Sequence, residues 1–317
     1  MTSRFLSVIT GLALSCSTAC HAPEKPAATS GKPRVAFVLK TLNSPFFIEM
    51  QKGAVEAAAK QNVDLVIQAA EREVDAEKQM QIVENLLQTG IKVLLITPSG
   101  SREIVAVLAK VNAAGIPIVV IDDRIDADVA AKAGVKIASY VGSDNVEGGR
   151  VAGRALVEMS GGKANVALLE GIAGHETGDS RLRGFKEAIK DSPGIKVVAS
   201  QTANWERDQG FTVFQNMMEA HPEIDAIFAC NDIMALGATE AIAAAGKTGK
   251  IRVIGFDAVD DARKAIEAGT MAASVAQLPS EMGRIAVESA AKLIKGEQIP
   301  AEQLVRIELV KKAPPAK

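Results

Sequence analysis

Side chains that can form hydrogen bonds with hydroxyl groups or stack on a ring follow seven short apolar runs of this sequence. The runs are 34–39, 116–121, 165–169, 195–200, 226–229, 253–256 and 273–276. The side chains that follow them are Lys40, Ser44, Phe46, Phe47, Asp123, Arg124, Arg181, Trp205, Asn231, Asp257 and Gln277. In open parallel α/β sheets a ligand lies outside the carboxyl ends of the strands, so these residues are expected to converge. The sequence therefore predicts a site for a small polar ligand.

The elements that must position these side chains alternate along the chain. Runs rich in Val and Ile alternate with Ala-rich amphipathic segments, which predicts βαβ units and an α/β fold with parallel sheets. Examples of the predicted helices are 47–60, 76–88, 104–114, 146–159, 207–220, 234–245 and 281–295. Because parallel crossovers are almost always right-handed, each half is expected to form a doubly wound, Rossmann-like layer. The length favours two such domains.

The first residues have the features of an export signal. Arg4 precedes an apolar stretch at 5–14, and small residues lead to Cys20, a pattern that favours a secretory signal over a membrane span. The cysteine after small residues resembles a bacterial lipobox. We expect a signal peptide at 1–19 and a lipidated Cys20, with Cys16 or an ordinary cleaved signal as the alternatives. Residues 20–32 then comprise this cysteine and a flexible tether.

Composition excludes several classes of function. The net charge of −2 and the absence of a Lys/Arg block argue against a nucleic-acid partner. The mature chain has no long apolar run, so we expect it to contact the membrane only through the lipid anchor. His21, His175 and His221 lack metal-ligand spacing, and no Gly-x-Ser-x-Gly motif is present, so we expect no metal, no cofactor and no catalysis. After processing at Cys20, Cys230 is the only unmodified cysteine, which precludes an internal disulfide.

Three segments are predicted to join the two domains. At 138–149 a short strand runs into a glycine-rich turn, after which a new series of βα units begins. The glycine spacing is not that of a dinucleotide or P-loop fingerprint, so a hinge is favoured over a phosphate site. Further crossings are expected near 277–279 and 304–307.

Eight motifs follow one another along the chain, at 39–47, 143–145, 171–174, 181–185, 203–205, 231–237, 255–257 and 276–279. In this order they resemble a known family, the periplasmic pentose- and hexose-binding proteins of ABC uptake systems, with ribose-binding and allose-binding proteins the nearest likeness. The resemblance extends from about Lys32 to Lys312.

The resemblance implies a type I periplasmic binding protein fold, with two domains that close on one sugar about a three-segment hinge. The expected N-terminal lobe is 33–143 plus 278–305, and the C-terminal lobe is 144–277 plus 306–315. It implies a monomer that delivers its ligand to an ABC permease and its ATPase subunit.

The resemblance also implies roles for individual residues. Phe46, Phe47 and Trp205 match positions that sandwich a sugar ring, and the chain has only nine Phe, one Tyr and one Trp. Carboxylates accept hydrogen bonds, guanidinium groups donate them and amides do both, so together they can saturate a neutral polyol. The matching polar positions are Asp123, Arg124, Arg181, Asn231, Asp257 and Gln277, and we also expect Lys40, Asn43 and Ser44 to bind the ligand.

The identity of the sugar depends mainly on Lys40. Lys40 and Trp205 resemble the allose-binding branch, whereas Arg124 follows the ribose pattern and Asn43-Ser44 inverts the order seen for allose binders. A monosaccharide of five or six carbons is predicted, with allose, ribose and psicose ahead of inositol.

Three other functions are considered. A sugar-modifying enzyme lacks support in the motifs. A repressor of the lactose-repressor family would carry a DNA-binding headpiece where this chain has an export signal. A sugar or polyol sensor that presents its closed form to a chemoreceptor or sensor kinase is not distinguished from a transport protein by the sequence.

Overall fold

The computed structural model describes residues 31–312, which form two six-stranded sheets covered by helices. The first sheet has the order β11 (Glu302–Val305), β5 (Ser139–Ser143), β4 (Ile118–Ile121), β3 (Val93–Ile96), β1 (Arg34–Thr41) and β2 (Asp64–Ala70). All its neighbouring strands are parallel. The second sheet has the order β12 (Glu308–Lys311), β10 (Ala273–Ala276), β9 (Arg252–Asp257), β8 (Ala226–Ala229), β6 (Lys163–Glu170) and β7 (Gly194–Thr202). Its strands are parallel except that β10 and β12 pair antiparallel.

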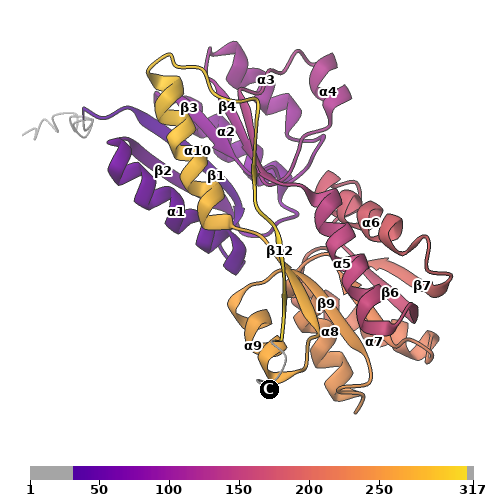
Figure 1. The fold of residues 1–317 in the computed structure, drawn as a ribbon. Helices are drawn as coiled ribbons and strands as arrows, with labels where there is room; N and C mark the ends of the chain where they lie inside the picture. The colour runs from indigo at the N-terminus through magenta and orange to yellow at the C-terminus, as the bar shows by residue number, and fades with distance from the viewer. Residues whose placement is uncertain (1–30, 313–317) are drawn as a thin grey trace, which may run out of the picture. The chain divides into compact units, whose positions relative to one another are not determined.

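Each sheet with its helices is called a lobe here. The helices of lobe 1 are α1 (Pro45–Gln61), α2 (Ala76–Leu87), α3 (Val105–Ala113), α4 (Ala127–Lys132) and α10 (Pro279–Ile294). Those of lobe 2 are α5 (Asn145–Ser160), α6 (Glu176–Ile189), α7 (Arg207–Ala220), α8 (Asp232–Ala244) and α9 (Asp260–Ala268). Figure 1 shows α10, which is late in the sequence, beside α1.

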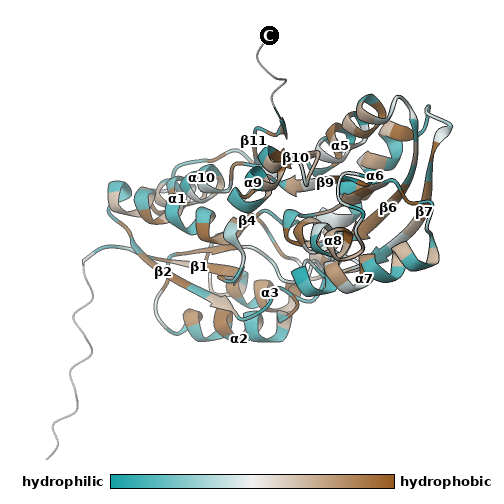
Figure 2. Cartoon of the chain, turned by 90° about the horizontal axis from the view of Figure 1, so that it is seen from below, coloured by the Kyte–Doolittle hydropathy of each residue, from teal (hydrophilic) through white to brown (hydrophobic). Residues whose placement is uncertain are grey.

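The core of lobe 1 lies on both faces of its sheet because side chains alternate along a strand. In β1, Val35, Phe37 and Leu39 pack with α1 and α10. Ala36 and Val38 pack on the other face with α2 and α3. In Figure 2 the strands are predominantly hydrophobic, whereas the helices carry hydrophilic residues as well. This pattern is expected of a doubly wound sheet that is buried on both faces.

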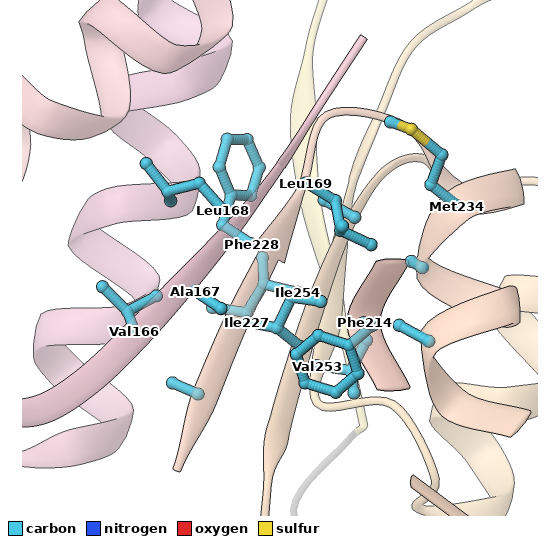
Figure 3. Packing of buried hydrophobic residues seen from close by; sticks show 14 of the residues in the cluster. Val166, Ala167, Leu168, Leu169, Phe214, Ile227, Phe228, Met234, Val253 and Ile254 are labelled. Atoms are coloured by element: carbon cyan, nitrogen blue, oxygen red, sulfur yellow. The ribbon is translucent and has the colours of Figure 1, made fainter. Parts of the chain in front are cut away.

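Lobe 2 has the same layered construction. Phe185 of α6 stacks on Phe228 of β8 at a centroid distance of 4.6 Å. Figure 3 shows Phe228 and Leu168 on one face of the sheet and Phe214 of α7 on the other. Burial of these faces leaves the strand ends free to present polar groups.

The chain passes between the lobes three times. The crossings lie between β5 and α5, between β10 and α10, and between β11 and β12. The predicted fold class is therefore confirmed: two doubly wound sheets joined by three segments. The signal segment 1–19, Cys16, Cys20, His21 and most of the tether lie outside the described residues, as do residues 313–315 of the expected C-terminal lobe.

Within residues 31–312, no helix has both the length and the apolar character that a membrane crossing requires.

Candidate functional site

A small cavity lies where the carboxyl ends of strands from both lobes meet. The thirteen residues that line it are Lys40, Ser44, Phe46, Phe47, Glu73, Asp122, Asp123, Thr177, Arg181, Trp205, Asn231, Asp257 and Gln277. Elements far apart along the chain thus contribute to one site, as the strand-end rule requires.

Ten of the twelve binding residues predicted from the sequence line this cavity, and two do not. The side-chain amide of Asn43 donates to the backbone oxygen of Glu71 at 2.8 Å. Arg124 forms an ion pair with Glu302 and lies over the ring of Tyr140 at 3.7 Å from its centroid. Both side chains are therefore engaged outside the cavity.

Sequence reasoning missed three lining residues, Glu73, Asp122 and Thr177. Asp122 comes directly after β4, one residue before the predicted Asp123. Glu73 follows β2, whose partly buried residues form no continuous apolar core run. Thr177 lies in the first turn of α6, which follows β6. The strand-end rule, applied to every strand, would have pointed to all three.

Lys40 lies between two carboxylates on the lobe 1 side of the cavity. It forms an ion pair with Asp123, both side chains being 2 % exposed, and its Nζ is 3.6 Å from Glu73 Oε2. Burial alone would lower the pKa of Lys40, but Asp123 and Glu73 outweigh burial and raise it above its usual range. Burial would likewise raise the pKa of Asp123, yet Lys40 holds it below its usual range. Both groups are therefore charged at neutral pH.

For two other carboxyl groups on the lobe 1 side, burial raises the pKa by more than Lys40 lowers it. Burial raises the pKa of Glu73 to about 7, although Lys40 opposes the shift. Burial and the neighbouring charge of Asp123 raise the pKa of Asp122 to about 6. The lobe 1 wall is therefore rich in hydrogen-bond acceptors, and full ionisation of its carboxyl groups is energetically unfavourable.

Arg181 is the central cation on the lobe 2 side. Its Nη1 donates to the backbone oxygen of Cys230 at 2.7 Å and lies 3.8 Å from Asp257 Oδ1. Its guanidinium lies over the Phe256 ring, 3.8 Å from the centroid. Burial raises the pKa of Asp257 to about 8 despite Arg181. The Gln277 amide donates to Asp257 Oδ1 at 2.8 Å, which fixes this carboxyl group from the second crossing segment.

Aromatic side chains contribute from both lobes. Phe46 and Phe47 of α1 meet edge to face, with centroids 5.3 Å apart. Trp205 reaches the same cavity from the loop after β7 and is buried. Its φ of 66° is in the left-handed region, an uncommon conformation that tends to be retained at functional sites.

Several buried polar atoms of the lining have no hydrogen-bond partner among the described residues. They are Asp122 Oδ1, Asp123 Oδ1, Thr177 Oγ1, Trp205 Nε1 and Gln277 Oε1. Most buried polar atoms in proteins are paired, so each exception calls for an explanation. Their common location in one cavity is explained if they bind the hydroxyls of a ligand. A wider groove shares Phe46, Asp257 and Gln277 with this cavity, but has no such concentration of unpaired atoms among the residues that the structure describes.

The lobes also contact each other beside the cavity. The backbone N–H of Glu176 donates to Ser101 Oγ at 3.4 Å, and Arg72 Nε lies 3.3 Å from Glu206 Oε1. His175 is buried in the same region, where burial and Lys40 lower its pKa to about 4. The described arrangement is therefore one in which the strand ends of both lobes enclose the cavity.

We predict that Gly171→Ala displaces the Trp205 ring and weakens ligand binding more than Gly178→Ala. A Cβ on Gly171 would lie 1.9 Å from Trp205 Cζ2, whereas one on Gly178 would lie 3.3 Å from the same ring. Because Trp205 is the only tryptophan, a shift of the emission maximum measures the displacement directly. An unchanged emission spectrum in Gly171→Ala would contradict the prediction.

Comparison with known proteins identifies close relatives of the chain. A family model described as periplasmic binding protein domain matches residues 35–298. The chain is 36% identical over 309 residues to the ribose import binding protein of Escherichia coli, covering 98% of each. It is 38% identical over 277 residues to the D-allose-binding periplasmic protein of the same organism, covering 87% of this chain and 89% of the relative.

Similar solved structures include a periplasmic solute-binding protein of an ABC transporter from Actinobacillus succinogenes with bound D-allose. The TM-score is 0.83 with 40% identity, covering 88% of this chain and 98% of that chain. These relatives are binding proteins rather than enzymes, in agreement with the prediction that this chain does not catalyse a reaction.

Proposed function

Because the chain belongs to the periplasmic binding protein family, we propose that it captures a neutral monosaccharide and delivers it to an ABC importer. The observation that carries the proposal is the small cavity in which unpaired buried polar atoms and aromatic rings from both lobes converge. Such a lining suits a ligand with many hydroxyl groups and two apolar ring faces. The relatives are named for ribose and D-allose.

In this proposal the sugar ring lies between the Phe46–Phe47 pair and Trp205, and its hydroxyls bind charged groups of both lobes. Asp123 and Asp257 accept hydrogen bonds, whereas Lys40 and Arg181 donate them. Hydrogen bonds to charged groups contribute about 1.5 to 3 kcal/mol each. About half a dozen of them support micromolar affinity after the entropic costs of binding.

Among sugars, we place allose, ribose and psicose ahead of cyclic polyols such as inositol. Lys40 adds a donor on the lobe 1 wall, where Asp123 and Glu73 hold its ammonium group. An additional donor suits a sugar with one more hydroxyl or hydroxymethyl group than a pentose. Arg124 and Asn43 are not part of the proposed contact set because the structure engages them elsewhere.

The proposed mechanism is closure of the two lobes about the three crossing segments. Lobe 1 is assigned residues 33–143 and 278–305, and lobe 2 residues 144–277 and 306–315. A sugar that contacts both walls favours the closed state by its higher affinity for that state. The contacts Glu176–Ser101 and Arg72–Glu206 would form on closure.

The remaining parts of the proposal concern location and partners. We propose an exported monomer, anchored by lipid at Cys20, that presents its closed form to a permease with its ATPase subunit. Mass measurement of the processed N-terminus tests the anchor, because an acylated N-terminus at residue 20 and an unmodified one differ by the mass of the acyl chains.

A binding screen tests the function, with D-allose, D-ribose, D-psicose and myo-inositol as probes. Since a ligand that binds only the native state stabilises it by about 2.7 kcal/mol at 100 times its Kd, at least one sugar is expected to raise the melting temperature. The same sugar should change the emission of Trp205, which lines the cavity. If none of the pentoses, hexoses or polyols changes either signal, the proposed function is wrong.

A further inference from the structure

Asn145 links a crossing segment to the binding site without lining the cavity itself. It is the first residue of α5, directly after the crossing from β5, and its side chain is buried at 5 % exposure. Its Oδ1 accepts a hydrogen bond from Arg181 Nε at 2.9 Å. This is the second buried bond that holds the guanidinium, in addition to the one to the Cys230 backbone oxygen.

Close packing of the α5 and α6 backbones makes the contact between Asn145 and Arg181 rigid. A Cβ on Gly149 of α5 would lie 2.0 Å from the backbone oxygen of Arg181, and one on Gly184 of α6 would lie 1.9 Å from the backbone oxygen of Val146. Glycine therefore permits the two helices to touch. With the helices in contact, Asn145 has little freedom to move relative to Arg181.

A second crossing segment makes an equivalent contact. Gln277, between β10 and α10, donates to Asp257, and Asp257 lies 3.8 Å from Arg181. Two side-chain amides, one directly after the first crossing segment and one in the second, thus hold Arg181 and Asp257, the two ionisable groups that face each other on the lobe 2 wall. Gln277 lines the cavity, whereas Asn145 does not.

We propose that Asn145 is a positioning residue that couples the first crossing segment to the ligand through Arg181. The inference deepens the proposed function and rests on it for its binding readout. Loss of the Asn145 acceptor leaves the buried Nε unpaired and the guanidinium free to turn away from the cavity. In such a variant the sugar binds a less well-ordered donor. In the unsubstituted protein, a change of backbone conformation at 143–145 moves Arg181 through this hydrogen bond and so alters its contact with the ligand.

The test compares three substitutions at this position. Asn145→Leu keeps the size of the side chain but removes the acceptor. Asn145→Ser is too short to reach Arg181, and Asn145→Asp keeps an acceptor. The matched control is Asn165→Leu, because Asn165 is half-buried at the start of β6 and its amide donates to the Glu223 backbone oxygen. Circular dichroism establishes that each variant is folded.

With D-allose and D-ribose as probes in calorimetry, Asn145→Leu and Asn145→Ser are expected to weaken binding about 10- to 100-fold. Asn145→Asp and Asn165→Leu should stay within about threefold of the unsubstituted protein. Rescue by aspartate distinguishes positioning of Arg181 from a general packing role, because aspartate restores the acceptor and adds no apolar contact.

A ligand-free measurement separates this inference from the proposed function. Arg181 lies 5.8 Å from the ring of Trp205, so a displaced guanidinium should shift the tryptophan emission in Asn145→Leu and Asn145→Ser but not in Asn145→Asp. If no sugar binds the unsubstituted protein, the proposed function fails while this signal still decides the role of Asn145. Unchanged emission in the folded Leu and Ser variants, or affinity within threefold of the unsubstituted protein, would overturn the inference.

Discussion

Arg181→Ala is expected to weaken sugar binding at least about 100-fold. The substitution removes a donor for the ligand, and it also leaves Asp257 without its nearby cation in a buried site. Hydrogen bonds to charged groups contribute about 1.5 to 3 kcal/mol each, and a guanidinium group can donate more than one of them to the sugar, so the loss should reach the roughly 2.8 kcal/mol that corresponds to a 100-fold change in affinity. Calorimetric titration with the sugar that gives the largest thermal shift measures the loss.

Arg124→Ala is the matched control for this substitution. Arg124 was also predicted to bind the ligand, but its ion pair with Glu302 lies outside the cavity and is more than one-third exposed on both sides. Exposed ion pairs contribute at most about 1 kcal/mol, so near-normal affinity is expected. Equal losses in the two variants would contradict the placement of the cavity, and near-normal affinity in Arg181→Ala would refute the role of Arg181.

Asp122→Asn is expected to stabilise the ligand-free protein at pH 7.5 while it weakens sugar binding. The Asp122 carboxyl is buried beside Asp123, and one of its oxygens is unpaired within residues 31–312. Its φ of 66° is in the left-handed region, which asparagine adopts more readily than most residues. The gain in the free energy of unfolding should be about 1 to 3 kcal/mol.

The pH dependence of this gain follows from the direction of the shift. The pKa of Asp122 is raised from 3.8 to about 6 in the folded protein. The folded protein therefore retains a proton that the unfolded chain releases, and this contribution to stability is complete below pH 3.8 and lost as the pH rises through 6. The amide of the Asp122→Asn variant cannot ionise, so the advantage of the variant should appear between about pH 4 and 7 in thermal or urea unfolding.

Asp123→Asn should have the opposite effect, which makes it a strong control. Lys40 lowers the pKa of Asp123, so the ionised carboxylate stabilises the fold above the unfolded pKa, and this contribution is lost as the pH falls. At pH 7.5 the asparagine variant leaves Lys40 without its closest partner and is expected to be less stable. If both variants change stability in the same direction at pH 7.5, the assignment of charges in the cavity is wrong.

Much of the fold could be predicted from the sequence because most of the buried strands are apolar runs that alternate with amphipathic helices. Runs such as 226–229 and 253–256 match the strands β8 and β9 closely, and the polar residues after them meet in one cavity. The geometry of parallel sheets explains why separate strand ends could be combined into one site without coordinates.

The residues for which the sequence prediction and the cavity lining differ are residues whose direction depends on local backbone conformation. After β4, the left-handed conformation of Asp122 turns the chain, and the pair that faces the cavity is Asp122 and Asp123 rather than Asp123 and Arg124. Sequence spacing does not reveal such a turn, because any of the three polar residues could face the ligand. Asn145 was unpredictable for another reason: it acts on Arg181 from a neighbouring helix and lies outside the cavity lining.

The cavity lining has more acidic than basic side chains, and this excess bears on which ligands can bind. Glu73, Asp122, Asp123 and Asp257 face only Lys40 and Arg181 among the lining cations. A hexuronate or a phosphorylated sugar would bring further negative charge into a desolvated enclosure that is already difficult to ionise fully. We therefore expect such a molecule to bind less tightly than an uncharged sugar of the same stereochemistry, because its charge would be desolvated beside carboxyl groups.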